Sequence, residues 1–478
     1  MSERARLDAV VIGSGPNGLA AALTLARAGR SVRVYEAAAD IGGGTRTQEL
    51  TLPGFRHDVC STIVPLTAAS PFFRTIDWAA RGVDLIHPDA PLAHAFSPER
   101  AVVLERSVTA TGAGFAEPAD ARGWRRLFGP LTREADALSR ELLRPVIHAP
   151  RHPLALARFG LPAVRSTVGL ARARFRGEEA RALFAGLAAH SMLELDRPLS
   201  ASFGLVLGMV AHAVGWPMVR GGSAAIAEAL AGELRELGGE IVVGHIVRSL
   251  ADVPPSKVVI ADTTPQALAA IAGDRLPART RRAYDRFRFG PGVFKIDWAL
   301  DGPIPWTAPG LARAATVHLG GTMGEIAASE AAVHAGRVSD RPFTLLCQYT
   351  PWDRSRAPAG KTTAWAYCHV PNGYDADLTE VLEVLVERSA PGFRDRILAR
   401  AVHGPAAMEA HDANYVGGDI NAGISDLRQL LFRPTVGLDP YHAGPGLYLG
   451  SSSTPPGGGV HGMSGHLAAR SALRRDLA

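Results

Sequence analysis

Short apolar runs alternate with glycine-rich turns at the start of the chain. The run LDAVVI at 7–12 is almost wholly apolar and rich in valine, which is typical of a strand buried on both faces of a sheet. A helical segment from Pro16 to about Ala28 follows, Gly29 ends it, and SVRVYE at 31–36 is a second strand. The order predicts a strand–turn–helix–strand unit at the N-terminus.

Later regions carry the same kind of buried strand. The segment 215–250 predicts a glycine turn, an amphipathic helix with Ile226, Leu230 and Leu234 inward, and a strand that begins at 240. SKVVIADTTPQAL adds another buried strand, which ends at Asp262. Near the C-terminus GLYLGSSS predicts a strand, and the glycines at 457–459 are expected to open a helix.

Apolar and polar positions alternate with a different period in residues 290–370. VFKIDWAL alternates, with Phe294, Ile296 and Trp298 on one side and Lys295 and Asp297 on the other. FTLLCQYT and TTAWAYCHV repeat this texture further on. Period-two alternation is typical of antiparallel strands, so we expect an antiparallel sheet in this part of the chain.

The composition fits a globular chain of more than one core. Of 478 residues, 47% are hydrophobic and 20% are charged. The net charge of +5 is carried almost wholly by arginine, and because no nucleic-acid motif is present we expect no nucleic acid partner. Cys60, Cys347 and Cys368 are isolated, which supports neither a dithiol centre nor a metal site. Few cysteines and no signal peptide favour a cytoplasmic location.

The turn after the first strand fits G-x-G-x-x-G, with Gly13, Gly15 and Gly18. The first glycine permits the tight turn, the second lets a pyrophosphate approach the backbone, and the third lets helix and strand pack closely. Pro16 and Asn17 begin the helix, whose free N–H groups and positive dipole end suit phosphates. These features predict a dinucleotide site.

An acid ends the second strand at the expected distance. Glu36 stands 21 residues after Gly15, where a carboxylate accepts a hydrogen bond from an adenosine ribose hydroxyl. The same carboxylate repels a 2′-phosphate, so NADP is disfavoured. No second G-x-G-x-x-G follows anywhere in the chain, so direct use of NAD(P)H is unsupported, and we expect oxygen, a quinone or another carrier as electron acceptor.

The next segment, DIGGGTRT, resembles an element of the two-dinucleotide-binding-domain flavoproteins, in which G-G-x-x-R-[ST] lines the pyrophosphate and the flavin. The match falls on Gly43, Gly44, Arg46 and Thr47. With GGEIVVGHIV, GGDINAG and LYLGSSSTPPGGGVHGMSG, the whole chain resembles the phytoene-desaturase-related FAD oxidoreductases. Within them it is most similar to the branch that holds flavin-type carotenoid ketolases and mitochondrial pyridine nucleotide-disulfide oxidoreductase domain proteins.

The resemblance implies an α/β fold in which a Rossmann-type FAD-binding domain is interleaved with an α+β substrate domain. The FAD-binding domain would comprise 1–75, 215–288 and 425–478, the helical lid region 76–214, and the antiparallel substrate sheet 289–424. Non-covalent FAD would then be held by the N-terminal glycines, Pro16, Asn17, Glu36 and Arg46, and by a later set. That later set is Val247, Gly450, Ser451, Gly459, Val460 and His461.

The catalytic candidates are His57, His461 and Asp419. His57, Asp58 and Cys60 lie in a segment that passes beside the flavin ring in the resembled family. Histidine titrates near neutral pH and suits a proton acceptor, but loop residues of this kind more often satisfy backbone groups. His461 occupies a position where carotenoid desaturases tend to have proline, which weakens a straightforward desaturase assignment.

Three functions remain open on the sequence. The first is an FAD-dependent dehydrogenase or desaturase that removes hydride from a hydrophobic, isoprenoid or carotenoid-like substrate. The second is a flavin amine oxidase acting on a C–N bond, for which Tyr415 would be one wall of an aromatic cage. The third is a non-catalytic FAD-binding protein.

The segment 142–177 contains no acid between its ends, while arginine recurs at a seven-residue spacing with apolar residues between. Such a pattern suits a basic amphipathic surface on an anionic membrane. Several prolines favour a set of short helices with a solvated basic face instead. Peripheral membrane contact through 142–177 is therefore an expectation that stays open.

Overall fold

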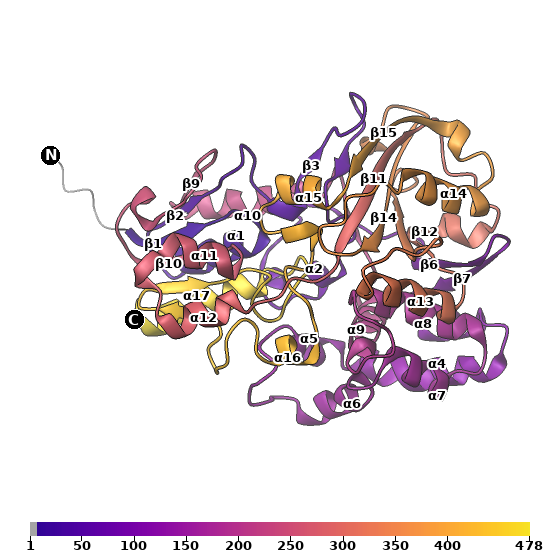
Figure 1. Ribbon diagram of the computed structural model, residues 1–478, viewed down its shortest axis with the longest axis horizontal. Helices are drawn as coiled ribbons and strands as arrows, with labels where there is room; N and C mark the ends of the chain where they lie inside the picture. The colour runs from indigo at the N-terminus through magenta and orange to yellow at the C-terminus, as the bar shows by residue number, and fades with distance from the viewer. Residues whose placement is uncertain (1–6) are drawn as a thin grey trace.

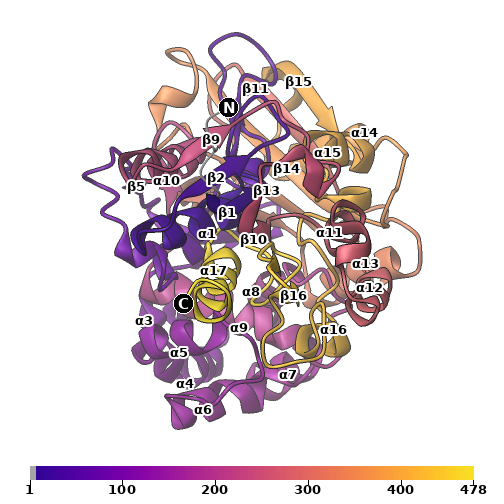
Figure 2. The same ribbon diagram turned by 90° about the vertical axis from the view of Figure 1, so that its left-hand side faces the viewer.

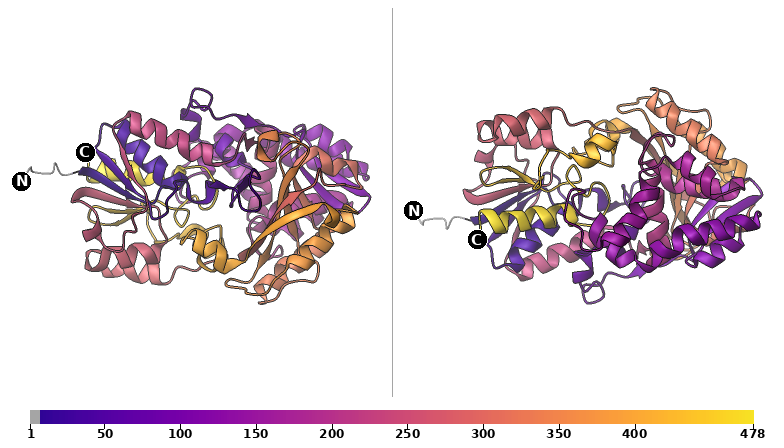
Figure 3. Two further views of the ribbon diagram at one scale, coloured as in Figure 1. Left: turned by 90° about the horizontal axis from the view of Figure 1, so that it is seen from above. Right: turned by 90° about the horizontal axis from the view of Figure 1, so that it is seen from below.

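Two β-sheets organise the molecule, and each is assembled from segments that are distant in sequence. The computed structural model describes residues 7–478, and the two sheets lie at opposite ends of it (Figures 1 and 3). Along those residues no helix is long and apolar enough to cross a bilayer.

The first sheet has the order β16-β17-β10-β1-β2-β9 and is parallel except at β16. Its strands are β1 (Leu7–Ile12), β2 (Val32–Tyr35), β9 (Glu240–Val242), β10 (Ser256–Ala261), β16 (His442–Gly444) and β17 (Leu447–Leu449). They come from the three ranges that sequence analysis assigns to the FAD-binding domain.

Both faces of this sheet are covered by helices. Ala9 and Val11 of β1 pack on one face, and Val10 and Ile12 pack on the other, because successive side chains of a strand point to opposite sides. Helices α1 (Pro16–Arg27), α10 (Ala224–Glu236) and α17 (Met463–Arg475) cover the first face, where α1 and α17 lie side by side (Figure 2). Helices α11 (Pro265–Ala272) and α12 (Ala278–Asp285) cover the second.

The second sheet has the order β15-β11-β14-β13-β12-β6-β7 and is antiparallel except between β12 and β6. Its strands are β6 (Ala90–Ser97), β7 (Arg100–Leu104), β11 (Gly292–Leu300), β12 (Ala314–Leu319), β13 (Thr344–Gln348), β14 (Thr362–Val370) and β15 (Ile397–His403). The expected alternation in β11 is confirmed, since Phe294, Ile296 and Trp298 all join one apolar cluster. Strands β6 and β7 come from 76–214, a range whose other elements are helices and the short strand at 85–86.

A helical layer packs below this sheet in Figure 1, and α14 (Thr379–Ser389) covers the opposite face. The helices of the layer below the sheet are α3 (Val108–Ala113), α4 (Pro118–Arg133), α5 (Ala135–Leu142), α6 (Pro153–Ala163), α7 (Thr167–Arg174), α8 (Glu178–Ala189), α9 (Ser200–Ala213) and α13 (Met323–His334). The segment 142–177 thus forms short helices, with Pro162 inside α6.

The remaining elements are short and lie in connections. They are β3 (Thr47–Gln48), β4 (His57–Asp58), α2 (Pro65–Ala69), β5 (Leu85–Ile86), β8 (Met218–Val219), α15 (Pro405–His411) and α16 (Leu427–Leu431). One expected boundary is wrong: the glycines at 457–459 do not open the last helix, which begins at Met463. They form a turn before it, and Gly462 caps the helix in a left-handed conformation at φ 66°.

The predicted fold class is confirmed. A Rossmann-like sheet with helices on both faces is interleaved with a second, mainly antiparallel sheet. The chain leaves the first sheet after β2, builds part of the second, returns for β9 and β10, leaves again and returns for β16, β17 and α17.

Candidate active site

A cleft of about 530 Å³ opens where the carboxyl ends of β1, β2 and β10 meet. Ligands of open α/β sheets bind at this edge, because strand ends and helix starts gather there. Gly13 follows β1, Glu36 follows β2 and Asp262 follows β10, and all of them line the cleft. Residues 410–415, 420–422 and 451–453 close it from other parts of the chain.

The fingerprint glycines make the close contacts that the sequence predicts. Gly13 has φ 98°, in the left-handed region. A Cβ on Gly18 would lie 2.1 Å from the carbonyl oxygen of Gly13, and one on Gly15 would lie 2.8 Å from a carboxylate oxygen of Asp262. Asn17 Oδ1 beside them is buried without a hydrogen-bond partner. The start of α1 is therefore an open cradle that fits a pyrophosphate.

Glu36 is buried in a dense set of hydrogen bonds. Its Oε2 accepts from the backbone N–H of Ser14 at 2.9 Å and from Ser14 Oγ at 2.6 Å. Its Oε1 accepts from the N–H of Ala38 at 2.9 Å and from Arg46 at 3.2 Å. Because the Ser14 hydroxyl can rotate, a ribose hydroxyl can take its place on the carboxylate. The arrangement fits the adenosine ribose.

The glycine-rich segment after β2 folds back on the fingerprint. Gly43 has φ 51°, and a Cβ there would lie 3.3 Å from the Cα of Gly15. A Cβ on Gly44 would lie 2.1 Å from the hydroxyl oxygen of Tyr415. Arg46 is buried and donates to the carbonyls of Asp40 and His411 as well as to Glu36. This segment joins the fingerprint loop to residues 411–415.

Asp262 lines the cleft, although the sequence pattern indicates only the end of a strand at this position. Its Oδ2 accepts a hydrogen bond from the N–H of Gly18 at 2.8 Å. Burial raises the pKa of Asp262 to about 7, and the negative charges of Asp412 and Glu36 add to the rise. A neutral acid at this point avoids repulsion of a pyrophosphate. The sequence signal for this role is an acid directly after the strand that pairs with β1.

The C-terminal segment contributes backbone and small side chains. Ser451, Gly459 and Val460 line the cleft, as does Val247 from the strand-end loop after β9. Gly450 does not line it: a Cβ there would lie 3.0 Å from the Cβ of Ala468, so this glycine lets the strand approach α17.

His461 lies behind the turn and not in the cleft. Its Nε2–H donates to the carbonyl of Gly457 at 3.1 Å, and its Nδ1 accepts from the N–H of Met463 at 3.0 Å. Burial lowers the pKa of His461 to about 4. With both ring nitrogens bonded to backbone, the neutral imidazole holds the turn in shape.

The other two catalytic candidates are also placed away from the cleft. Asp419 accepts hydrogen bonds from the backbone N–H groups of Gly290, Asn421 and Gly423, so its carboxylate stabilises the loop at 419–423. His57 is buried, with its Nε2 2.9 Å from the Thr51 hydroxyl oxygen. Of the candidates His57, Asp58 and Cys60, only Cys60 lines the cleft.

A second cavity of about 200 Å³, the apolar pocket, adjoins the cleft. Cys60, Ser61, Ile420, Gly459 and Val460 line both. The apolar pocket is further lined by Thr62, Ile63, Val64, Pro65, Leu66, His190, Leu207, Trp216, Thr316, Leu345, Cys347, Trp365 and Tyr367.

The rings of Trp365 and Tyr367 form one wall of the apolar pocket. Their centroids are 5.5 Å apart and their planes differ by 9°, so the rings are stacked. Trp365 Nε1 donates to the Thr62 hydroxyl oxygen at 2.8 Å, which fixes the indole. The rings pack on each other and leave no gap between them for a third group.

A buried charged cluster lies beside this wall on the same face of the second sheet. Lys295 pairs with Asp297, and Nδ1 of His57 lies 3.4 Å from the same carboxylate. Burial alone would raise the pKa of Asp297, but Lys295, His403 and His57 outweigh it and hold that pKa below its usual range. Lys295 Nζ stands 5.4 Å from the centroid of Trp365. The two charges on one face of β11 were the sequence signal for this cluster.

The fold and the cleft define the class: this chain is an FAD-dependent oxidoreductase. A sequence profile described as "NAD(P)-binding Rossmann-like domain" matches residues 11–77. Pyridine nucleotide-disulfide oxidoreductase domain-containing protein 2 of Mus musculus is 26% identical, and the alignment covers 98% of this chain and 94% of that protein. The predicted relationship to these proteins, the enzyme class and the FAD cofactor are confirmed.

Two further proteins are similar to this chain, one in sequence and one in structure. A subunit of limonene dehydrogenase from Castellaniella defragrans is 33% identical over 132 residues, which is 27% of this chain and 23% of that protein. The solved structure of wild-type putrescine oxidase bound to putrescine matches with a TM-score of 0.64 at 18% identity and covers 98% of each chain. The latter shows a shared fold.

Proposed function

We propose that this protein is a dehydrogenase or desaturase that oxidises an uncharged, hydrophobic substrate of isoprenoid type in the apolar pocket. The observation that carries the proposal is the junction of the two cavities. Cys60, Ile420 and Val460 line both, so a molecule in the apolar pocket meets a molecule in the cleft. FAD, when bound, supplies a hydride acceptor at its ring.

The chain contributes binding, orientation and exclusion of water. Leu207, Leu345 and Trp216 surround the substrate with apolar surface, and the stacked wall limits its rotation. Burial of a hydrocarbon against such walls is worth roughly 25 cal/mol per Å² of apolar surface. Binding energy of this kind positions a C–H bond without any charged contact.

The chemistry of the pocket favours this substrate class over an amine. Among the described residues that line the apolar pocket there is no Asp or Glu. An ammonium group brought there would lose its hydration without gaining a carboxylate partner. The rings of Trp365 and Tyr367 stack on each other, whereas the two walls of an aromatic cage would face each other across an open gap. The similarity to a limonene dehydrogenase supports an isoprenoid hydrocarbon, since limonene is one.

Anaerobic reduction of the flavin tests the proposal. Purified holoenzyme is mixed with limonene, with longer isoprenoids and with putrescine, and bleaching of the flavin absorbance is recorded. We expect bleaching with an isoprenoid and none with putrescine. Leu207→Trp, which fills the pocket, should abolish the bleaching, and Leu161→Trp on exposed α6 should not. Bleaching by putrescine alone would overturn the proposal in favour of an amine oxidase.

A further inference from the structure

A ring nitrogen of His190 faces the apolar pocket without a partner among the described residues. His190 follows α8 and lines the apolar pocket, and its Nε2 lies 3.0 Å from Nε2 of His318, within hydrogen-bond distance. Its Nδ1 bonds to none of the residues that the structure describes. Nδ1 of His318 is sealed in the core, whereas Nδ1 of His190 is not, so it faces the pocket that His190 lines.

The hydroxyl oxygen of Tyr367, on β14, is a second unpaired atom of the pocket wall. It makes no hydrogen bond within the described part of the chain, and it is not sealed in the core as the hydroxyl of Tyr349 is. Burial raises the pKa of Tyr367, so this hydroxyl keeps its proton. Only a bound molecule or water can pair with it in the pocket.

The ring of His190 is held in place and is neutral. His318 engages Nε2, and the indole of Trp216 packs against the ring with centroids 5.7 Å apart and planes at 84°. Burial, followed by the charge of His369, lowers the pKa of His190 to about 3. His369 itself pairs with Glu330 at 2.9 Å. A fixed, neutral imidazole suits an uncharged hydrogen-bonding group.

The polar atoms of the pocket select a hydroxyl over other groups. A pure hydrocarbon would displace water and leave Nδ1 of His190 and the Tyr367 hydroxyl unpaired, which weakens binding. A charged group would lose its hydration without an opposite charge, since the described residues that line the apolar pocket include no Asp, Glu, Lys or Arg. A hydroxyl is neutral and both donates and accepts, so it bonds to Nδ1 of His190 in either tautomer.

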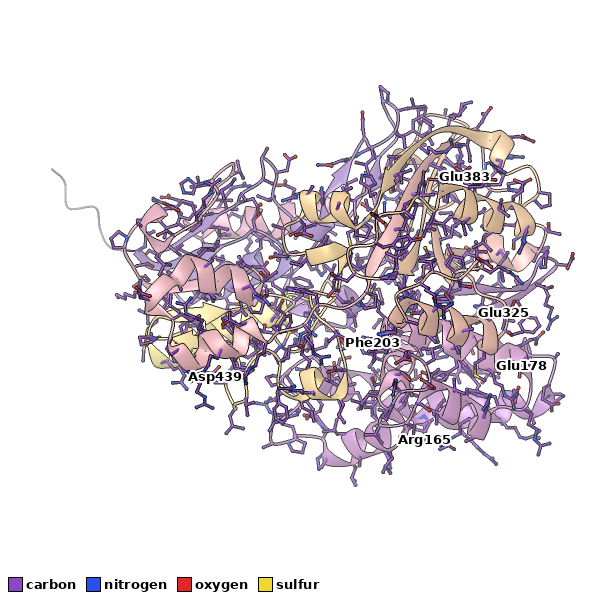
Figure 4. All side chains as sticks on the ribbon, viewed as in Figure 1. Arg165, Glu178, Phe203, Glu325, Glu383 and Asp439 are labelled. Atoms are coloured by element: carbon purple, nitrogen blue, oxygen red, sulfur yellow. The ribbon has the colours of Figure 1, made fainter. Side chains whose placement is uncertain are left out.

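His190 reaches the apolar pocket from the helical layer. Figure 4 shows Glu178, at the start of α8, on the side of the molecule away from the first sheet, and His190 follows the opposite end of that helix. The residues shared with the cleft come instead from 60–61, 420 and 459–460, and His190 is not one of them. A hydroxyl held at His190 therefore leaves the hydrocarbon part of the molecule at the junction of the two cavities.

We propose that the substrate is an isoprenoid with one hydroxyl group, which His190 binds as an anchor while a C–H bond of the hydrocarbon part lies at the junction. The hydroxyl is held and is not the group that is oxidised. This inference rests on the proposed function in treating the apolar pocket as the substrate site, and it narrows the substrate class. His190 is the specificity-determining residue, and Tyr367 offers a second hydrogen bond. The anchor fixes which carbon atom meets the cofactor.

Carveol and limonene form a matched pair of probes, because they share one carbon skeleton and differ by a hydroxyl. Titration calorimetry measures both dissociation constants with holoenzyme whose flavin has been reduced beforehand, so no turnover follows. His190→Leu should weaken carveol binding about tenfold and change limonene binding by less than about twofold. The control is His442→Leu on β16, since His442 lines neither cavity, and it should leave both constants as they are.

Three results of the titration would overturn the anchor. The first is a parent protein that does not bind carveol. The second is a ratio of the two dissociation constants that is the same in His190→Leu as in the parent, because a purely structural fault affects both probes alike. The third is a larger loss of carveol binding in Tyr367→Phe than in His190→Leu.

Nitrogen-15 NMR of the labelled parent protein makes the test independent of the folding of any variant. Carveol should shift the Nδ1 signal of His190, and limonene should not. An Nδ1 signal that responds alike to the two probes would refute the anchor. Failure of every isoprenoid to bleach the oxidised flavin would instead refute the proposed function and leave the contact between carveol and His190 standing.

Discussion

The carboxylate of Asp262 accepts a hydrogen bond from the backbone N–H of Gly18 at 2.8 Å, at the point where the cofactor's phosphates are expected. The bond ties the end of β10 to the first turn of α1. It also places an acid with a strongly raised pKa inside the cleft. The ionisation of this acid should therefore be visible in the protein's pH dependence.

Replacement of Asp262 by Asn should flatten the pH dependence of stability. The folded-state pKa is raised from 3.8 to about 7, so the stabilisation is complete below 3.8 and is lost as pH rises through about 7. Asn keeps an acceptor for Gly18 but does not ionise. At pH 8 the variant should be more stable than the parent apoprotein by roughly 4 kcal/mol, measured by denaturant unfolding. Parallel pH curves for the two proteins would contradict the assignment.

Gly18→Ala should lower both stability and flavin content. Its Cβ would meet the carbonyl oxygen of Gly13 at 2.1 Å, which only a backbone shift can relieve. The matched control is Gly232→Ala in α10, where nothing lies within 4 Å of the added Cβ. That change should stabilise by about 0.5–1 kcal/mol through helix propensity. Thermal melts and the ratio of flavin to protein absorbance would separate the two variants.

The buried pair of Lys295 and Asp297 should be far more sensitive than a surface pair of the same type. Asp297→Asn leaves a buried ammonium without its carboxylate and should cost about 3–5 kcal/mol. Asp301→Asn breaks the pair with Lys361, whose members are 56% and 36% exposed, and should cost about 0–1 kcal/mol. Equal costs in urea unfolding would show that the buried cluster is already solvated.

The same pair sets a direction for acid sensitivity. The folded-state pKa of Asp297 is lowered, so its stabilisation is present at neutral pH and is lost as pH falls below the ordinary range of an aspartate. Asp297→Asn should therefore lose less stability on acidification than the parent. A steeper loss in the variant would show that Asp297 is not ionised in the folded state.

Membrane contact through 142–177 is testable at α6. Leu154 and Leu161 are 74% and 76% exposed, and arginines of the same segment line a neighbouring groove with Leu438. We expect co-sedimentation with vesicles that contain phosphatidylglycerol, weakened by salt and by Leu154→Asp with Leu161→Asp. Leu398→Asp on β15, which is 46% exposed in the parent, should bind as before. Equal binding by both variants would remove α6 from the contact.

Much of the cofactor site could be predicted because its signal is local. Gly13, Gly15, Gly18 and Glu36 act within one strand–turn–helix–strand unit, where spacing along the chain determines spacing in space. The adjacent Gly43 and Arg46 belong to the same continuous stretch and also line the cleft. Composition and periodicity likewise sufficed for the two kinds of sheet.

Local sequence patterns did not determine the function of single histidines and acids. His57 and His461 have the residue type of a proton acceptor, but folding places one against Asp297 and the other inside a backbone turn. Asp262 lines the cleft and His190 lines the apolar pocket because strands and helices that are distant in sequence meet in the folded chain. The sequence by itself determined the cofactor class, since a contiguous motif binds it. Only the tertiary structure decided which titratable groups reach the pocket, because burial and long-range pairing assign each ring nitrogen and carboxylate its partner.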